Sequence, residues 1–166
     1  IDPTNAALDA RGQGHTVIKA YFDATVADKF IAEHGYPDII TFTNVFAHIE
    51  DLKGLLKAIK TLVRASGETI LVIENHYLGA VLRTNQFDTF YHEHPRTYSA
   101  TSFMHIAKLL DMSIDSISFP SRYGGNIRVV MTTGCKTNND GLYRNILEQE
   151  RNFPKLFAEM RAFVDL

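Results

Sequence analysis

The chain has 166 residues, which is enough for one domain with a sizeable core and too short for two comfortable ones. Hydrophobic residues make up 45% of it, charged residues 22%, and the formal net charge is -2, which excludes a disordered chain and gives no electrostatic case for nucleic acid or an anionic membrane surface. The single cysteine, Cys135, excludes a disulfide framework or a multi-cysteine zinc site within this chain. The sequence also shows no apolar run of membrane-spanning length and no leader-like opening, so we expect a cytoplasmic protein.

The first half of the chain alternates helical and strand patterns. Capping residues and a proline open it and predict a helix that ends near residues 12–14. A short strand is expected at 16–18, and a helix over Ala24 to His34 that Gly35 ends. The run at 38–43 is nearly all apolar or β-branched, which predicts a strand covered on both faces by helices.

The following segment continues this alternation. Leucines and isoleucines recur at helical spacing over residues 52–63, and Gly67 is expected to close that helix. A second buried strand is expected at 69–73. Helix, strand, helix and strand with short links are typical of a doubly wound, largely parallel sheet.

The second half has a different organisation. Residues 75–96 show no clean period, and a helix is expected over 101–110. Two candidate strands at 112–119 and 127–132 are predicted to form an antiparallel hairpin. Apolar spacing from Leu142 onwards predicts a helix that is interrupted near its proline.

Polar residues follow the predicted strands. In open α/β sheets ligands bind beyond the carboxyl ends of the strands, so Asp2, residues 44–48 and Glu74 are expected to face one crevice. Asp2 is suited to accept hydrogen bonds from a ribose diol, and it is equally suited to cap a helix. Phe22 is a candidate for packing on an adenine ring, although an aromatic after a strand is more often part of the core.

Residues 86–99 are the richest stretch of the chain. They hold two histidines, two carboxylates, two tyrosines and an arginine. One alternative is a metal site, because His92 and His94 would point the same way on an extended chain and could share a cation; a solvated polar loop is a second alternative. The favoured interpretation is acid–base chemistry, with neutral His94 as the base and Glu93 or His48 beside it.

Three motifs resemble one family. Asn-Val-Phe-Ala-His-Ile-Glu-Asp at 44–51, Phe-Asp-Thr-Phe-Tyr-His-Glu-His at 87–94 and Gly-Gly-Asn-Ile-Arg-Val at 124–129 occur in this order. They look like successive motifs of S-adenosylmethionine-dependent C-methyltransferases that act on nucleotide-linked deoxysugars. The resemblance covers about residues 1–135; its Tyr-His-Glu-His motif is specific, whereas N-x-x-x-H alone is not.

The resemblance implies a fold and its boundaries. It implies an α/β, Rossmann-like methyltransferase sheet, mostly parallel with a C-terminal antiparallel hairpin, that lacks its first strand and glycine-rich turn. Residues 1–135 would form a partial methyltransferase domain, and residues 136–166 a helical segment leading to a further domain. Without the first strand, the strand at 38–43 becomes an exposed edge, so we expect the isolated fragment to self-associate or rearrange, to bind cofactor weakly, and to be inactive.

The resemblance also implies a reaction and its residues. In the family a histidine deprotonates the carbon beside the ketone of a 4-keto sugar, and the enolate attacks the sulfonium methyl group without a metal. By resemblance His94 is the base, and the other residues follow in three groups: Tyr91, Glu93 and His48 orient the sugar or stabilise the enolate; Asp2, Phe22 and Asn44 bind S-adenosylmethionine; Glu74, Tyr123, Asn126 and Arg128 bind the nucleotide-linked ketosugar.

The sequence departs from the family at two places. Tyr123 stands where a histidine is common before the paired glycines, and Asn75-His76 stands where a proline is common. The glycine pair is also compatible with a simple hairpin turn. Two other functions stay open: a Rossmann methyltransferase acting on oxygen or nitrogen of a small molecule, and a non-catalytic nucleotide-sugar-binding module.

Overall fold

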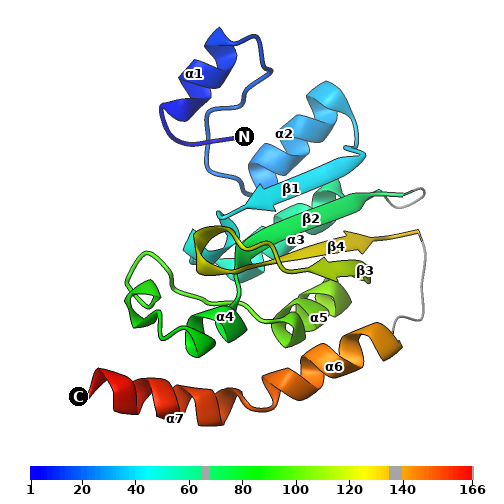
Figure 1. Cartoon of the computed structure of the whole chain (residues 1–166). Coiled ribbons are helices and arrows are strands. Elements are labelled where there is room, and N and C mark those ends of the chain that lie inside the picture. Colours follow the sequence, from blue (N-terminus) through cyan, green and yellow to red (C-terminus); the bar gives the residue numbers. More distant parts are fainter. Residues whose placement is uncertain (65–67, 135–139, 166) are drawn as a thin grey trace. The chain divides into compact units, whose positions relative to one another are not determined.

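The computed structural model describes residues 1–64, 68–134 and 140–165 (Figure 1). The chain divides into two compact units. The first unit comprises residues 1–37 and 51–66, and the second comprises residues 38–50 and 67–166. The sheet and the two C-terminal helices belong to the second unit.

The first unit contains the helices α1 (Ala6–Gly12), α2 (Ala24–His34) and α3 (Leu52–Leu62), close to their predicted bounds. The Asp23 side chain accepts a hydrogen bond from the Val26 amide at the start of α2, and Gly35 ends the helix with a φ of 77°. Helices α2 and α3 pack together. Gly67, the expected end of α3, lies outside the described residues.

The prediction of a strand at residues 16–18 is wrong. These residues form an irregular segment, and the carbonyl of Ile18 accepts one backbone hydrogen bond, from the Asp2 amide at 3.2 Å. Three β-branched or apolar residues are too few to hold an extended conformation without a ladder of hydrogen bonds along them. Local composition alone therefore misidentified this segment.

The second unit is built on a four-stranded sheet with the order β1-β2-β4-β3 (Figure 1). Its strands are β1 (Ile39–Thr43), β2 (Ile70–His76), β3 (Ser113–Ser118) and β4 (Asn126–Thr132). β1 pairs with β2 in parallel, whereas β4 pairs antiparallel with both β2 and β3. The predicted hairpin of the last two strands is confirmed, but the expectation of a mostly parallel sheet is wrong, because β4 inserts between β2 and β3.

Strand β1 lies at one edge of the described sheet, as expected, and self-association through it stays a prediction. It is not buried on both faces: Ile40 is buried, whereas Ile39 is 58% exposed and Thr41 and Thr43 are also exposed. The continuous apolar run therefore gave a wrong prediction of its environment. Strand β2 is one of the two inner strands, and its Leu71 and Ile73 are fully buried.

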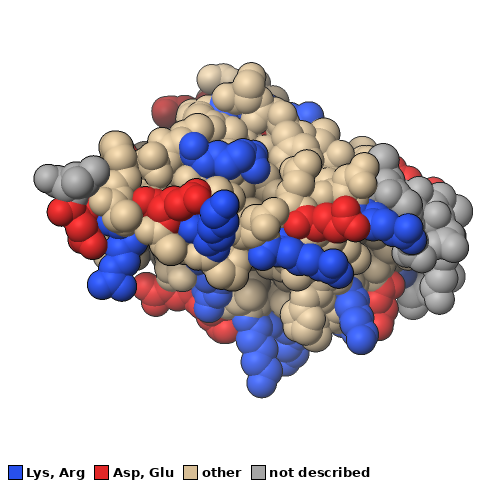
Figure 2. Space-filling view, turned by 60° about the horizontal axis from the view of Figure 1, so that its bottom comes forward, with Lys and Arg blue, Asp and Glu red and all other residues tan. Residues whose placement is uncertain are grey.

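Four helices complete the second unit: α4 (Leu78–Arg83), α5 (Ala100–Leu109), α6 (Asp140–Glu150) and α7 (Phe153–Val164). α5 begins at a capping box in which Ser99 and Ser102 exchange hydrogen bonds with each other's backbone. Pro154 lies in the first turn of α7, where proline is tolerated, so the predicted interruption falls at the boundary between α6 and α7. Figure 2 shows acidic and basic side chains intermixed on one face. Among the described residues no helix combines the length and apolar character needed to cross a membrane.

Candidate active site

The segment after β1 is fixed by its backbone and by an aromatic cluster. Asn44 adopts a left-handed conformation, with a φ of 52°, and its amide donates a hydrogen bond to the Glu74 carbonyl at 2.8 Å. Phe46 is fully buried, with its ring 5.4 Å from that of Tyr98 and 6.4 Å from that of Phe103. Burial raises the pKa of Tyr98 to about 12, so its hydroxyl stays neutral at physiological pH. This packing holds the short 3-10 helix Phe46–His48 in place.

Two histidines are each oriented by a backbone carbonyl. His48 Nδ1 lies 2.8 Å from the carbonyl oxygen of Glu93, and His94 Nδ1 lies 3.1 Å from that of Thr89. A carbonyl oxygen only accepts hydrogen bonds, so each Nδ1 must carry the proton and donate it. In the neutral form of both rings the free lone pair is therefore on Nε2, which is the form that a general base requires.

Tyr91 completes the surroundings of His94. Its hydroxyl lies 3.4 Å from His94 Nε2, and the two ring centroids are 4.4 Å apart. The His94 ring also lies 4.5 Å from the His48 ring. A phenol hydroxyl beside the basic nitrogen can orient the imidazole or donate to an oxygen of a bound ligand.

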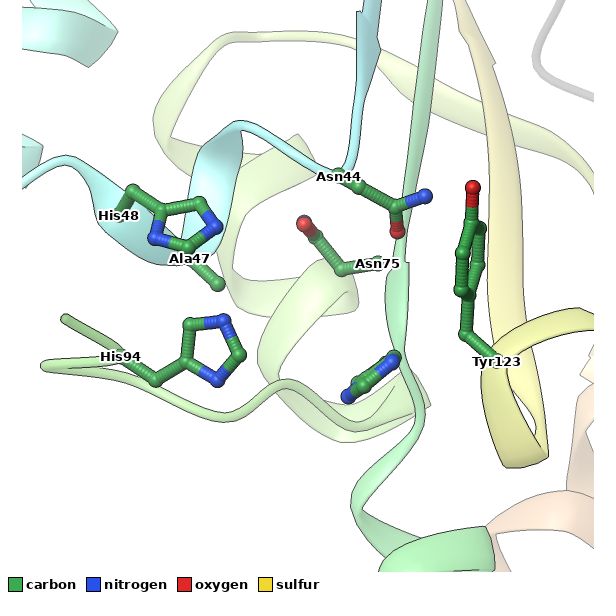
Figure 3. Close-up of a pocket in the computed structure, with 7 residues that line it drawn as sticks. Asn44, Ala47, His48, Asn75, His94 and Tyr123 are labelled. Carbon is green, nitrogen blue, oxygen red and sulfur yellow. The ribbon is translucent and has the colours of Figure 1, made fainter. Parts of the chain in front are cut away.

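These residues surround a pocket of about 250 Å³ (Figure 3). Its lining comprises Asn44, Ala47, His48, Asn75, His76, His94 and Tyr123. Figure 3 shows the rings of His48 and His94 on one side and that of Tyr123 on the other. The lining residues come from the segment after β1, the end of β2, the segment before α5 and the turn before β4.

His76 is the third histidine of the pocket, and its surroundings disfavour its protonated form. Burial and then the nearby His94 and His48 lower the pKa of His76 below its ordinary value of 6.5. The neutral form of the His76 imidazole is therefore favoured at neutral pH. Within residues 1–64, 68–134 and 140–165, no group of three or more His, Cys, Asp or Glu side chains is arranged to hold a metal ion.

A buried carboxylate anchors the turn that carries Tyr123. Glu74 is 2% exposed and pairs with Arg122 Nε at 2.9 Å and with Arg128 Nη2 at 2.7 Å. Burial raises the pKa of Glu74, but hydrogen bonds from Asn126 and Arg128 and the charges of both arginines outweigh that effect and lower it overall. The carboxylate is therefore charged at neutral pH and ties the turn to β2.

The same network reaches the pocket through Asn126. The Asn126 side-chain amide lies 2.9 Å from Glu74 Oε1 and 3.2 Å from Asn44 Oδ1. Tyr123, in the turn, has a φ of 55° and is 64% exposed. Two residues of the pocket wall, Asn44 and Tyr123, thus occupy left-handed conformations that cost free energy and persist only where surrounding contacts enforce them.

Asp2 and Phe22 belong to the first unit. The Asp2 carboxylate accepts hydrogen bonds from the amide and the hydroxyl of Thr4 at 2.7 and 2.6 Å, which lower its pKa. The helix-cap interpretation of Asp2 is wrong, because the residue before α1 is Asn5 and Asp2 instead closes a turn with Thr4. Phe22 is half-buried. Their predicted role in cofactor binding stays a prediction.

The structure brings together part of the predicted site. Asn44, His48, His94 and Tyr123 line the pocket, and Tyr91 contacts His94. The other predicted residues of the second unit do not line it. The Glu93 side chain is exposed, and its backbone carbonyl accepts a hydrogen bond from His48. Glu74, Asn126 and Arg128 form the supporting network. Sequence reasoning placed Ala47 within the crevice-facing segment 44–48, but it did not propose Asn75, His76 or Arg122 as site residues. The position of Asn75 and His76 directly after an apolar strand was the signal available for them.

Comparison with known proteins identifies the class of the chain. Residues 1–116 match a family described as a methyltransferase domain. The chain therefore belongs to this methyltransferase family. Among curated proteins, the C-methyltransferase NovU of Streptomyces niveus is 30% identical over 130 residues, which are 78% of this chain and 30% of that protein. The matched part thus spans less than a third of the relative's length.

Proposed function

We propose that the protein containing this chain transfers a methyl group from S-adenosylmethionine to a carbon of a nucleotide-linked 4-keto-deoxysugar. The observation that carries this proposal is the pair His48 and His94, each with its Nδ1 held by a backbone carbonyl and its Nε2 left as the basic atom. Methylation of carbon differs from methylation of oxygen or nitrogen in that a weakly acidic C–H proton must first be removed. An oriented neutral base in a pocket meets this requirement.

His94 acts as the base in this proposal. Its Nε2 takes the proton from the carbon beside the ketone, and the electron pair of that C–H bond forms the enolate. The Tyr91 hydroxyl, 3.4 Å from Nε2, orients the ring or donates to the enolate oxygen. When bound, S-adenosylmethionine would supply the methyl group from its sulfonium to the enolate carbon, with cleavage of the methyl C–S bond and a neutral thioether as the leaving group.

The predicted cofactor residues have the chemistry that a nucleoside requires. Asp2 offers a carboxylate that accepts hydrogen bonds from a ribose diol, Phe22 offers an aromatic face, and Asn44 offers a side-chain amide at the end of β1. Asp2 stays ionised at neutral pH because its hydrogen bonds with Thr4 lower its pKa. Each of these side chains is by its own chemistry suited to a nucleoside, and Asn44 lines the pocket.

The test uses the full-length protein and a thymidine-diphosphate-linked 4-keto-6-deoxysugar in deuterium oxide. We expect deuterium to enter the carbon beside the ketone, and His94→Asn to slow this exchange by about 10²- to 10⁴-fold, the usual contribution of a general base. His105→Asn serves as the control, since His105 is exposed on α5.

Each alternative function gives a distinct result in this assay. Methyl transfer to oxygen or nitrogen without deuterium exchange would favour a different small-molecule methyltransferase. Binding of the nucleotide sugar with neither exchange nor transfer would favour a non-catalytic binding module. Unchanged exchange in His94→Asn would refute the role of His94.

A further inference from the structure

Asn75 is a buried amide that has no partner for either of its polar atoms. The residue is 1% exposed, and among the described residues neither its Nδ2 nor its Oδ1 has a hydrogen-bond partner. It nevertheless lines the pocket, where Figure 3 shows its amide oxygen directed toward the space between Asn44 and His48. Its low exposure places it at the floor of the pocket rather than at its mouth.

Such an amide is unusual in a folded protein. Buried side-chain amides are nearly always hydrogen-bonded, because an unpaired buried donor or acceptor loses its water without compensation. In the neighbouring Asn126 only the oxygen lacks a partner among the described residues, because its amide nitrogen donates to both Glu74 and Asn44. Asn75 lies one residue from Glu74 on the same strand, yet has no such bond. Its two free atoms therefore point to a bound group that supplies both partners.

The geometry of a carboxamide limits what that group can be. Its oxygen accepts and its nitrogen donates, and the two atoms lie side by side, so the matching ligand needs one donor and one acceptor on adjacent atoms. A ketone alone would satisfy Nδ2 and leave Oδ1 unpaired. A ketone with a hydroxyl on the neighbouring carbon satisfies both, because its carbonyl accepts from Nδ2 and its hydroxyl donates to Oδ1.

We propose that Asn75 is a specificity-determining residue that binds an α-hydroxy ketone with both atoms of its amide. The substrate is then a ketosugar that keeps a free hydroxyl on a carbon beside the ketone, rather than one deoxygenated there. This inference rests on the proposed function for the ketone itself. It adds the chemical group next to the ketone and the residue that recognises it.

The test compares two thymidine-diphosphate-linked sugars by calorimetric titration of the full-length protein: a 4-keto-6-deoxyhexose with its 3-hydroxyl, and the same sugar without it. Losing the hydroxyl leaves Oδ1 unpaired, so we expect roughly 5- to 150-fold weaker binding of the second sugar. Asn75→Leu removes both polar atoms at similar volume. It should weaken binding of the hydroxylated sugar and bring the two affinities within about twofold of each other.

Two further variants keep the test decisive. Asn152→Leu is the matched control, because Asn152 is exposed and makes no side-chain cap bond at α7, and it should leave the preference unchanged. Asn75→Asp keeps an acceptor for the hydroxyl but loses the donor to the ketone. It should weaken binding of both sugars while the preference for the hydroxylated one persists, and circular dichroism checks that each variant is folded.

The outcomes separate this inference from the function on which it rests. Equal affinity of the parent protein for the two sugars would overturn the inference and leave ketosugar methylation standing. An equal loss for both sugars in Asn75→Leu would also overturn it, since Asn75 would then only shape the pocket. Binding of neither sugar would overturn the proposed function, and the inference with it.

Discussion

Replacing Glu74 by Gln removes the only negative charge in a group that also contains Arg122 and Arg128. Glu74 is 2% exposed, while the side chains of the two arginines are 51% and 39% exposed. Breaking a fully buried ion pair by removing one partner costs about 3–5 kcal/mol. Because both arginines can turn partly toward solvent and Gln can keep the bond from Asn126, we expect a loss of about 2–3 kcal/mol in the free energy of unfolding.

Urea unfolding at pH 7, followed by circular dichroism, measures this loss. The lowered pKa of Glu74 fixes the sign of its pH dependence: the stabilisation is complete above the unfolded pKa of about 4.3 and is lost as the pH falls through the lower folded value. Glu159→Gln is the control, because its ion pair with Lys155, at 3.6 Å, is exposed to solvent and should contribute little. A loss below about 0.5 kcal/mol for Glu74→Gln, or an equal loss when both arginines are already replaced by Gln, would refute the reasoning.

Three other changes test separate parts of the structure. Glu150 accepts hydrogen bonds from the first amides of α5, so Glu150→Gln should lower the unfolding free energy by about 1–2 kcal/mol, measured by urea unfolding. His94→Asn removes a neighbouring imidazole whose protonated form would repel a charged His76, so it should raise the pKa of His76 in an NMR titration; no change would mean that burial and His48 account for the lowered value. Gly125 has a φ of 122°, and an added Cβ would lie 2.6 Å from the Ala80 Cβ, whereas Gly14, with a φ of 90°, has open space. Gly125→Ala should therefore destabilise by about 1–3 kcal/mol more than Gly14→Ala, and equal losses in thermal unfolding would contradict the clash.

Periodicity predicted the helices well because their signals are local. α2 and α5 match the expected bounds to within a residue, since an N-cap at Asp23 or Ser99 and a regular apolar face are both visible in sequence. The sheet was harder to predict. β2 continues through Glu74, Asn75 and His76, which are polar and gave no strand pattern.

The reason lies in contacts between distant parts of the chain. Glu74 is buried in β2 because Arg122 and Arg128, 48 and 54 residues away, neutralise it. The insertion of β4 beside β2 was equally invisible, since no local pattern specifies which strand pairs with which. Within the site, the motif residues His48 and His94 were found from sequence, whereas Asn75 was not, because its significance comes from lacking a partner in the folded chain.

The orientation of the two histidines has a consequence for how the chain tolerates variation. The atoms that hold the rings are the main-chain oxygens of residues 89 and 93, which every amino acid possesses. Most substitutions at Thr89 or Glu93 would leave those oxygens in place, while a one-residue insertion or deletion between them would displace at least one. A mutational library should thus accept many amino acids at positions 89 and 93 but only one length of the segment between them.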